Sequence, residues 1–208
     1  MFDSRLRPLI DPPLAAAAAA LERTGLSANA LTVAGLAAGL GAATAIASQA
    51  WTAALALVAC NRLLDGLDGA LARRRGPTDF GGYLDALCDF AFYAAVPLAF
   101  AIADPGRNAL PAATLLASFL GTGASFLGFA AVAARRGLAT ETQGRKSIYY
   151  LAGLAEGGET IAVFVAFCLW PQRFPAIAYG FAALCAITVL ARLRVARELL
   201  DASGRANP

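Results

Sequence analysis

Long apolar stretches alternate with short polar segments along almost the whole chain. Six stretches stand out, near residues 29–50, 51–72, 82–103, 109–134, 147–170 and 174–193. A helix needs about 20 mostly apolar residues to cross the hydrocarbon core of a bilayer, and several of these stretches approach that length. The pattern therefore predicts an all-α membrane protein with six transmembrane helices. Almost every apolar run then belongs to a span, which leaves no large soluble core.

The two ends of the chain have a different pattern. Before the first apolar stretch, arginines are interspersed with leucine and isoleucine, which is typical of an amphipathic helix lying in the membrane interface. After the last stretch, the sequence DASGRANP has the character of a frayed terminus. We expect three parts: an interfacial helix at residues 1–28, a six-helix transmembrane domain at 29–200, and a flexible tail at 201–208.

The distribution of charge gives the expected orientation. The chain is 59% hydrophobic and only 15% charged, whereas soluble domains average about 25% charged residues. Fourteen of its 17 lysines and arginines fall on one side of the predicted spans: Arg5, Arg7, Arg23, Arg73, Arg74, Arg75, Arg135, Arg136, Arg145, Lys146, Arg192, Arg194, Arg197 and Arg205. Because cytoplasmic loops carry an excess of such residues, we expect both termini in the cytoplasm of a multi-pass protein of the inner (cytoplasmic) membrane.

Four aspartates stand close together in a chain that otherwise avoids charge. They are Asp65, Asp68, Asp85 and Asp89, within the segment DGLDGALARRRGPTDFGGYLDALCDF. Spacings of three and four residues place each pair on one face of a helix. Gly76-Pro77 breaks the helical pattern between the pairs, so the two helices can run antiparallel. The pairs then face each other across one cleft at the cytoplasmic surface.

This arrangement favours a divalent metal site. Carboxylates that close repel one another, and Mg²⁺ or Mn²⁺ with oxygen ligands removes the conflict. Gly66, Gly69 and Gly81 leave room for a bulky ligand near the backbone. Arg73 is positioned to reach a phosphate held by the metals. The alternative is a set of charges solvated at the membrane surface, but four carboxylates among so many glycines favour the metal site.

The same segment resembles the signature of the CDP-alcohol phosphatidyltransferases, D-x-x-D-G-x-x-A-R followed by G-x-x-x-D-x-x-x-D. The matching residues are Asp65, Asp68, Gly69, Ala72 and Arg73 in the first half, and Gly81, Asp85 and Asp89 in the second. The spacer between the two halves has seven residues here, one fewer than the commoner eight. The strict match covers 25 of 208 residues, and six spans with a cytoplasmic site extend the resemblance to the whole chain.

The resemblance implies a role for each residue of the signature. Two divalent ions, Mg²⁺ or Mn²⁺, would be held by Asp65, Asp68 and Asp85. Asp89 would be the general base and would also lie close to a metal. The residues implied to contact the liponucleotide are Gly69, Arg73, Thr78, Asn29 and Thr32. The last two begin the first span, where Ala28 stands in place of the family's usual proline.

The implied activity is transfer of a phosphatidyl group from CDP-diacylglycerol to a small polar alcohol, with release of CMP. The expected partners are that liponucleotide, the alcohol acceptor, membrane lipids and a second copy of the chain. Homodimers are common in the family, and small residues in the third and fourth spans would supply the contact. No nucleic-acid partner is expected. The signature leaves the acceptor alcohol open.

Two sets of residues are candidates for binding the acceptor. The cations Arg135, Arg136, Arg145 and Lys146 precede the fifth span, where they suit a phosphorylated alcohol. The charge distribution expected for a cytoplasmic loop also accounts for them. Within the fifth span, Glu156 and Glu159 either recognise acceptor hydroxyls or form a structural hydrogen bond to an arginine of the second span.

Arg62 also lies inside a predicted span. A charged side chain at that depth needs a partner, and a nearby carboxylate is the simplest choice. Intramembrane charges are also found in transporters, which gives an alternative function of a different class. Clustering of the carboxylates at one membrane face, and the lack of matched inverted halves, weigh against a transport path. Two further alternatives are transfer of a CDP-linked headgroup to a lipid alcohol, and a scaffold without catalysis.

Overall fold

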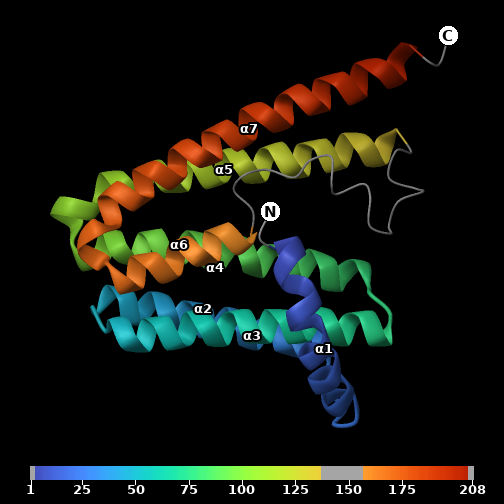
Figure 1. Ribbon diagram of the computed structural model, residues 1–208, viewed down its shortest axis with the longest axis horizontal. Helices are drawn as coiled ribbons and strands as arrows, with labels where there is room; N and C mark the ends of the chain where they lie inside the picture. Colours follow the sequence, from blue (N-terminus) through green and yellow to red (C-terminus); the bar gives the residue numbers. More distant parts are fainter. Residues whose placement is uncertain (1–2, 137–156, 206–208) are drawn as a thin grey trace.

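The computed structural model describes residues 3–136 and 157–205, with side chains placed for residues 11–136 and 157–200. Within these ranges the chain is helical and forms no strand. The elements are α1 (Asp3–Glu22), α2 (Ala28–Ala47), α3 (Trp51–Arg75), α4 (Asp79–Ala103), α5 (Pro105–Arg135), α6 (Gly157–Leu169), a short 3₁₀ turn (Pro171–Arg173) and α7 (Phe174–Arg205). The predicted all-α fold is confirmed (Figure 1).

Four helical segments are long and apolar enough to cross a membrane. They are Ala28–Ala47, Asp79–Ala103, Pro105–Arg135 and Pro171–Leu200. Helix α3 is as long as α4, at 25 residues, but carries several charges, and the described part of α6 has 13 residues. The count of six spans therefore stays a prediction for these two helices. Helix α7 continues to Arg205, so the boundary expected at residue 200 is not a helix end.

Local sequence explains where the helices begin and end. The side chains of Ser27, Thr78 and Asp104 each accept a hydrogen bond from a backbone N–H in the first turn of the helix that follows. Such caps satisfy backbone donors that have no partner inside the helix. Gly76, at the end of α3, has φ +92°, a conformation that side chains with a Cβ rarely adopt. The turn between the two aspartate pairs is therefore fixed by Gly76 and Thr78.

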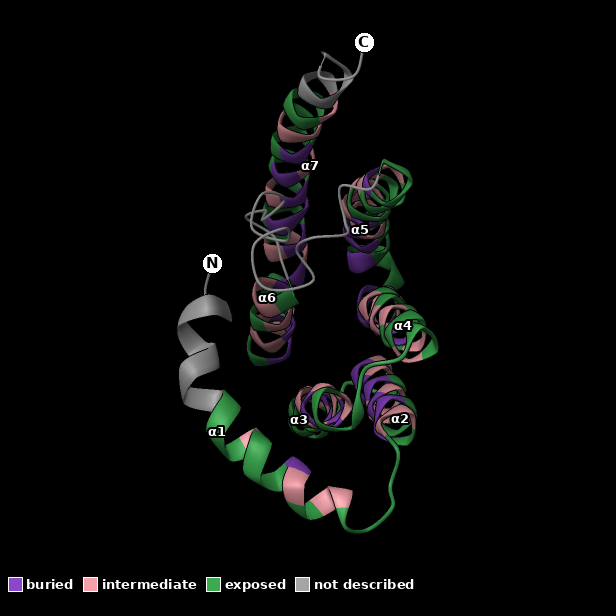
Figure 2. Cartoon of the chain, turned by 90° about the vertical axis from the view of Figure 1, so that its right-hand side faces the viewer, coloured by how far each residue is buried: buried purple, intermediate pink, exposed green. Residues whose placement is uncertain are grey.

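Helix α2 positions the two helices that carry the aspartates. It packs closely against both α3 and α4, and these contacts are more extensive than direct contact between α3 and α4 (Figure 2). Gly39 permits the approach to α4, because a Cβ there would lie 2.6 Å from Cδ2 of Phe92. The aspartates of α3 and α4 therefore face each other across a space whose width is set by α2.

The main core lies in the half of the bundle away from the α3–α4 turn. Its largest side chains are fully buried aromatic rings from three helices: Phe92, Phe100, Phe164, Phe167 and Phe174. The rings of Phe100 and Phe174 stack with centroids 4.4 Å apart, which joins α4 to the beginning of α7. This packed half leaves the other half of α3 and α4 free to carry polar groups.

Helix α1 runs across the direction of the other helices (Figure 1). It packs on α3 through a small buried cluster that includes Ala18 and Leu71. Arg74 pairs with Glu22 at 2.8 Å, and Arg75 donates to the backbone carbonyl of Glu22 at 2.9 Å. Two cations of the α3 terminus thus hold the C-terminal end of α1 beside the aspartate-bearing helices.

Candidate metal and phosphoryl-transfer site

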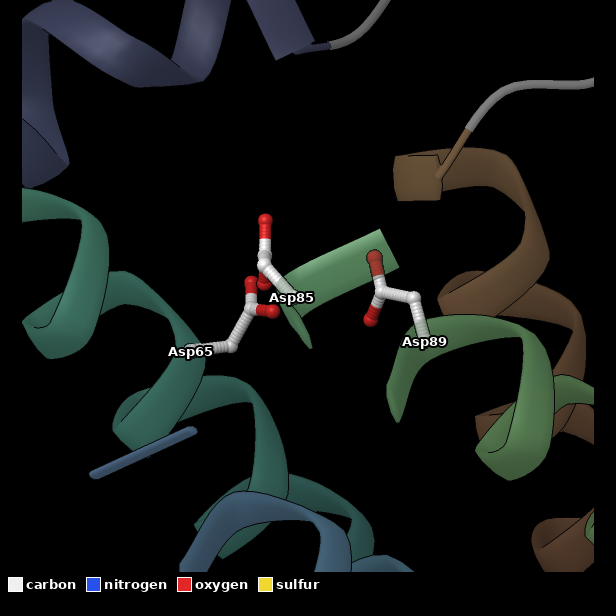
Figure 3. A group of neighbouring side chains, drawn as sticks. All are labelled: Asp65, Asp85 and Asp89. Carbon is white, nitrogen blue, oxygen red and sulfur yellow. The ribbon is translucent and has the colours of Figure 1, made fainter. Parts of the chain in front are cut away.

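Three of the four aspartates converge. One carboxylate oxygen from each of Asp65, Asp85 and Asp89 lies within 4.8 Å of the others. Figure 3 shows Asp65 extending from α3 toward the two side chains of α4. Asp85 is exposed, whereas Asp65 and Asp89 are half-buried. The predicted meeting of the two pairs is therefore present in the structure.

Asp68 lines the same pocket as the other three but is almost fully buried, with 5% of its surface exposed. Its Oδ2 atom has no hydrogen-bond partner among the described residues. A buried carboxylate oxygen without a partner is costly, and a bound cation would supply the missing interaction. An all-carboxylate donor set is the kind that Mg²⁺ and Mn²⁺ prefer. The residues present therefore fit the divalent metal that the signature implies.

Arg62 extends into the cluster of carboxylates. Its Nη2 atom lies 3.1 Å from Oδ1 of Asp89, and its Nη1 atom lies 3.5 Å from Oδ2 of Asp65. The expectation that Arg62 pairs with a nearby carboxylate is confirmed. Asp65 is three residues away on the same helix, whereas Asp89 is 27 residues away on α4.

The residues implied to contact the liponucleotide are brought together in small groups. Arg73 folds back over Gly69, since a Cβ at Gly69 would lie 3.4 Å from Nη1 of Arg73. A Cβ at Gly81 would lie 2.9 Å from Oγ1 of Thr78 and 3.3 Å from Oδ1 of Asn29. The glycines of the signature thus stand where polar side chains of neighbouring turns crowd the backbone.

Thr32 joins the liponucleotide candidates to the carboxylates. It is buried, lines the pocket that holds all four aspartates, and its hydroxyl lies beside the Asp68 carboxylate. The hydroxyl also donates to the backbone carbonyl of Ala28 at 3.1 Å. Thr32 therefore belongs to the wall of the pocket, on the α2 side.

The candidate acceptor residues are only partly described. Arg135 is exposed in the last turn of α5. Arg136 donates to the backbone carbonyl of Leu200 on α7 at 2.7 Å, which ties the ends of these helices together. Glu159 is half-buried in the first turn of α6. The remaining three candidates, Arg145, Lys146 and Glu156, lie outside the described residues.

The buried polar residues that the sequence did not single out include Asn61 and Arg192. Asn61 is 3% exposed and lines the pocket. Arg192, which the sequence suggested only as one of the cations on the cytoplasmic side, is 9% exposed. Its Nη1 atom donates to the carbonyl of Thr122 at 3.1 Å, and its guanidinium lies 5.7 Å from the centre of the ring of Phe126. The position of Arg192 at the end of an apolar run was the one available signal.

Comparison with known sequences agrees with the geometry. The sequence model of the CDP-alcohol phosphatidyltransferases matches residues 26–190. The inner membrane protein YnjF of Escherichia coli K12 is 48% identical over 193 residues, which cover 93% of this chain and 94% of that protein. An archaetidylinositol phosphate synthase of Pyrococcus horikoshii is 32% identical over 118 residues, or 56% of this chain and 63% of that protein.

Solved structures of one enzyme have a similar fold. Mycobacterium tuberculosis phosphatidylinositol phosphate synthase (PgsA1) with CDP-DAG bound has a TM-score of 0.63 and 27% identity, covering 88% of this chain and 92% of that one. The same enzyme in complex with manganese and citrate has a TM-score of 0.64 and 28% identity, covering 88% of each chain. The chain therefore belongs to the CDP-alcohol phosphatidyltransferase family and is an enzyme of membrane phospholipid synthesis.

Proposed function

We propose that this enzyme transfers a phosphatidyl group from CDP-diacylglycerol to a small polar alcohol and releases CMP. The observation that carries the proposal is the single pocket lined by Asp65, Asp68, Asp85 and Asp89, with oxygens of three of them within 4.8 Å of one another. Further support comes from the similar PgsA1 structure, which has CDP-DAG bound.

The proposed metal ligands are Asp65, Asp68 and Asp85, with Asp89 beside them, and we assign two divalent ions, Mg²⁺ or Mn²⁺. The manganese complex of PgsA1 supports the kind of ion. Ions held there would neutralise the negative charge that develops on the diphosphate oxygens as CMP leaves. The unpartnered Oδ2 atom of Asp68 supports a cation on the buried side of the pocket.

Asp89 is the proposed general base. Its carboxylate accepts the proton of the acceptor hydroxyl as the acceptor oxygen bonds to the phosphorus attached to diacylglycerol. The bond from that phosphorus to the bridging oxygen breaks, and this oxygen departs with CMP. The half-buried position of Asp89 beside Asp65 and Asp85 suits this role, because the proton is taken at the edge of the metal cluster.

The nucleotide end of the donor would lie along the α3–α4 turn. We assign its contacts to residues grouped there and at the beginning of α2: Gly69, Arg73, Thr78, Asn29 and Thr32. Exposed Arg73 supplies a guanidinium for phosphate oxygens, and Gly69 leaves room for that guanidinium to lie close to the backbone. The lipid tails of the donor would extend into the bilayer beside the bundle.

We place the enzyme in the inner membrane, as a multi-pass protein with the site and both termini facing the cytoplasm. The name of the E. coli relative and the concentration of cations near the α3–α4 turn support this placement. We also propose the three-part division of the chain at residues 28 and 200, and a homodimer in the membrane. Small residues on α5, such as Gly128, which has no neighbour within 4 Å of the position of a Cβ, would allow close helix contact.

For the acceptor we propose a phosphorylated polyol. The relatives named as inositol phosphate synthases support this class. The candidate groups for its phosphate are Arg135, Arg136 and Lys146, and the candidates for its hydroxyls are Glu156 and Glu159. Reversing the charge of Arg136 or Lys146 should raise KM for the acceptor, and an unchanged KM would remove that residue from the phosphate site.

The decisive experiment is CMP release from CDP-diacylglycerol by the purified protein in detergent with Mn²⁺ or Mg²⁺. Inositol phosphate, glycerol phosphate, inositol and serine would be compared as acceptors. Asp89→Asn should abolish turnover while the protein still inserts and folds, because the amide cannot accept the proton. Exposed Asp79, on the first turn of the same helix, provides the matched control, since Asp79→Asn should retain activity.

Two outcomes would overturn the proposal. A wild-type rate in purified Asp89→Asn enzyme would remove the general base from its assigned role. CMP release that requires a CDP-linked headgroup and a lipid alcohol, in place of CDP-diacylglycerol, would reverse the direction of group transfer.

A further inference from the structure

Arg62 is a cation built into the carboxylate pocket, although it is not one of the eight positions of the signature. It lies one turn before Asp65 on α3, and its two terminal nitrogens reach different carboxylates. Nη2 contacts Oδ1 of Asp89 at 3.1 Å, and Nη1 contacts Oδ2 of Asp65 at 3.5 Å. One guanidinium therefore bridges the helices that supply the metal ligands.

The guanidinium is fixed from behind by neighbouring helices. Its Nε atom donates to Oδ1 of Asn61 at 2.8 Å, and Nδ2 of Asn61 donates to the backbone carbonyl of Gly35 on α2 at 2.8 Å. Its central carbon lies 5.4 Å from the ring centroid of Phe92, which is fully buried on α4. Such stacking and hydrogen bonding hold the cation in place. Arg62 is thus a constrained side chain whose charge is directed at the pocket.

The position of this charge matters for metal binding. Arginine stays protonated at any ordinary pH, so Arg62 places a permanent positive charge against Asp65 and Asp89. Asp68, which lines the same pocket, has no such contact and leaves Oδ2 without a partner in the described part of the chain. A divalent ion held by both Asp65 and Asp89 would lie within a few ångströms of the guanidinium that contacts the same two carboxylates. The two like charges repel at that distance.

We propose that Arg62 is an internal counter-cation of the metal site, which occupies the Asp65–Asp89 side when no metal is bound and competes with a divalent ion there. The inference rests on the proposed assignment of these aspartates as metal ligands. Arg62 then has two effects. It stabilises the metal-free fold by offsetting repulsion among the carboxylates, and it weakens binding of the ion nearest Asp89. Arg62 is a positioning residue, since it acts through Asp65 and Asp89.

The test is a Mn²⁺ titration of the purified full-length protein in detergent, followed by the electron paramagnetic resonance signal of free Mn²⁺. Thermal unfolding is measured with and without the ion. Arg62→Gln removes the charge and keeps much of the length of the side chain. Arg62→Lys keeps the charge but cannot make both contacts. Arg74→Gln, which breaks the Arg74–Glu22 pair outside the pocket, is the matched control.

We expect Arg62→Gln to bind Mn²⁺ at its weakest site about tenfold more tightly than the wild type, as loss of a like charge a few ångströms away predicts. Its metal-free form should unfold at a lower temperature, and the gain in melting temperature on adding Mn²⁺ should be larger. Arg62→Lys should fall between Arg62→Gln and the wild type. Arg74→Gln should bind Mn²⁺ as the wild type does.

Unchanged or weaker Mn²⁺ binding by Arg62→Gln would overturn the inference, because it would give Arg62 a purely structural role. Should Arg62→Gln fail to fold, Mn²⁺ affinity of Arg62→Lys at or below the wild-type value would have the same meaning. Absence of Mn²⁺ binding in every variant would overturn the metal assignment and this inference together. Suppose that Arg62→Gln binds Mn²⁺ more tightly, but the wild-type protein releases no CMP from CDP-diacylglycerol. The inference would then stand and the proposed function would be rejected.

Discussion

The four aspartates of the site have different surroundings, and their chemistry should differ accordingly. Asp85 is exposed, and Asp65 and Asp89 face the guanidinium of Arg62. Asp68 is nearly buried, with one oxygen lacking a partner among the described residues. A charge in that position depends on a bound cation more than the other three do, because the side chain is almost fully buried and no cationic side chain in the described part of the chain pairs with it.

Asp68→Asn should therefore separate metal binding from folding. The neutral amide removes a buried charge that costs free energy in the metal-free protein, so the metal-free variant should unfold at the same or a higher temperature. Loss of one ligand charge should lower Mn²⁺ affinity by about tenfold or more and CMP release by about a hundredfold or more. Mn²⁺ titration, thermal unfolding and the CMP assay measure the three effects. A destabilised variant that keeps its Mn²⁺ affinity would contradict the assignment of Asp68.

At this scale, the sequence identifies some side chains better than others. The aspartates were predictable because helical spacing puts each pair on one face and a specific signature contains them all. The need of Arg62 for a carboxylate partner was also predictable, but Asp89 is 27 residues away, and its contact depends on how α3 and α4 are held. The burial of Asn61 and Arg192 depends on the rotation of their helices against neighbours, which no local pattern specifies.

Among the elements, α2 has the largest influence on the geometry of the site. It packs against both helices that carry aspartates, and its small residues determine how close they come. Gly35 accepts a hydrogen bond from Asn61, which in turn holds Arg62. Gly39 lies against Phe92, whose ring faces Arg62. The predicted cleft between the aspartate pairs therefore depends on a third helix, α2, which holds α3 and α4 at the distance that forms the pocket.

Gly39→Ala should test this dependence on α2. Its Cβ would lie 2.6 Å from Cδ2 of Phe92 and 3.3 Å from Nδ2 of Asn61, so a buried ring has to shift. We expect a loss of stability of about 1–3 kcal/mol, as in other overpacked cores, with a loss of activity because Arg62 loses its support. Thermal or chemical unfolding in detergent and the CMP assay provide the measurements.

Gly41→Ala, on the same helix, is the matched control. The nearest atom to its Cβ would be Cδ1 of Leu57, at 3.5 Å, which is ordinary van der Waals contact. It should behave as the wild type does. Equal stability of the Gly39 and Gly41 variants would show that close approach of α2 to α4 does not determine the shape of the pocket.

In the whole molecule, successive helices run in alternating directions, so every second turn lies at the same end of the bundle. The α3–α4 turn and the C-terminal ends of α5 and α7 lie toward one end of the bundle, and the turns that flank the main core lie toward the other (Figure 1). At the second end, Arg107 donates to the backbone carbonyl of Gln172, which joins two of the turns. The sequence predicted this alternation from the spacing of apolar runs. Helix α3 carries several charges and is not among the four segments that are long and apolar enough to cross a membrane, so its span stays a prediction.

The same arrangement leads to a prediction about orientation. Arg73, Arg74 and Arg75 lie at the turn beside the site, so the positive-inside rule places the pocket on the cytoplasmic side, where a polar acceptor can enter. Cysteine labelling in intact cells tests this placement. With exposed Cys60 replaced by alanine, Gln172→Cys should react with a membrane-impermeant maleimide from outside. Pro77→Cys, in the exposed α3–α4 turn, should react only after lysis.

The three remaining cysteines, Cys88, Cys168 and Cys185, are buried, so the background protein should label weakly and serves as the control. Labelling of Pro77→Cys in intact cells, with Gln172→Cys protected until lysis, would show that the protein has the opposite orientation in the membrane. The acceptor would then have to come from outside the cytoplasm, and a phosphorylated polyol made in the cytoplasm could not reach Asp89. The orientation of the bundle and the chemistry of the acceptor are therefore constrained by one measurement.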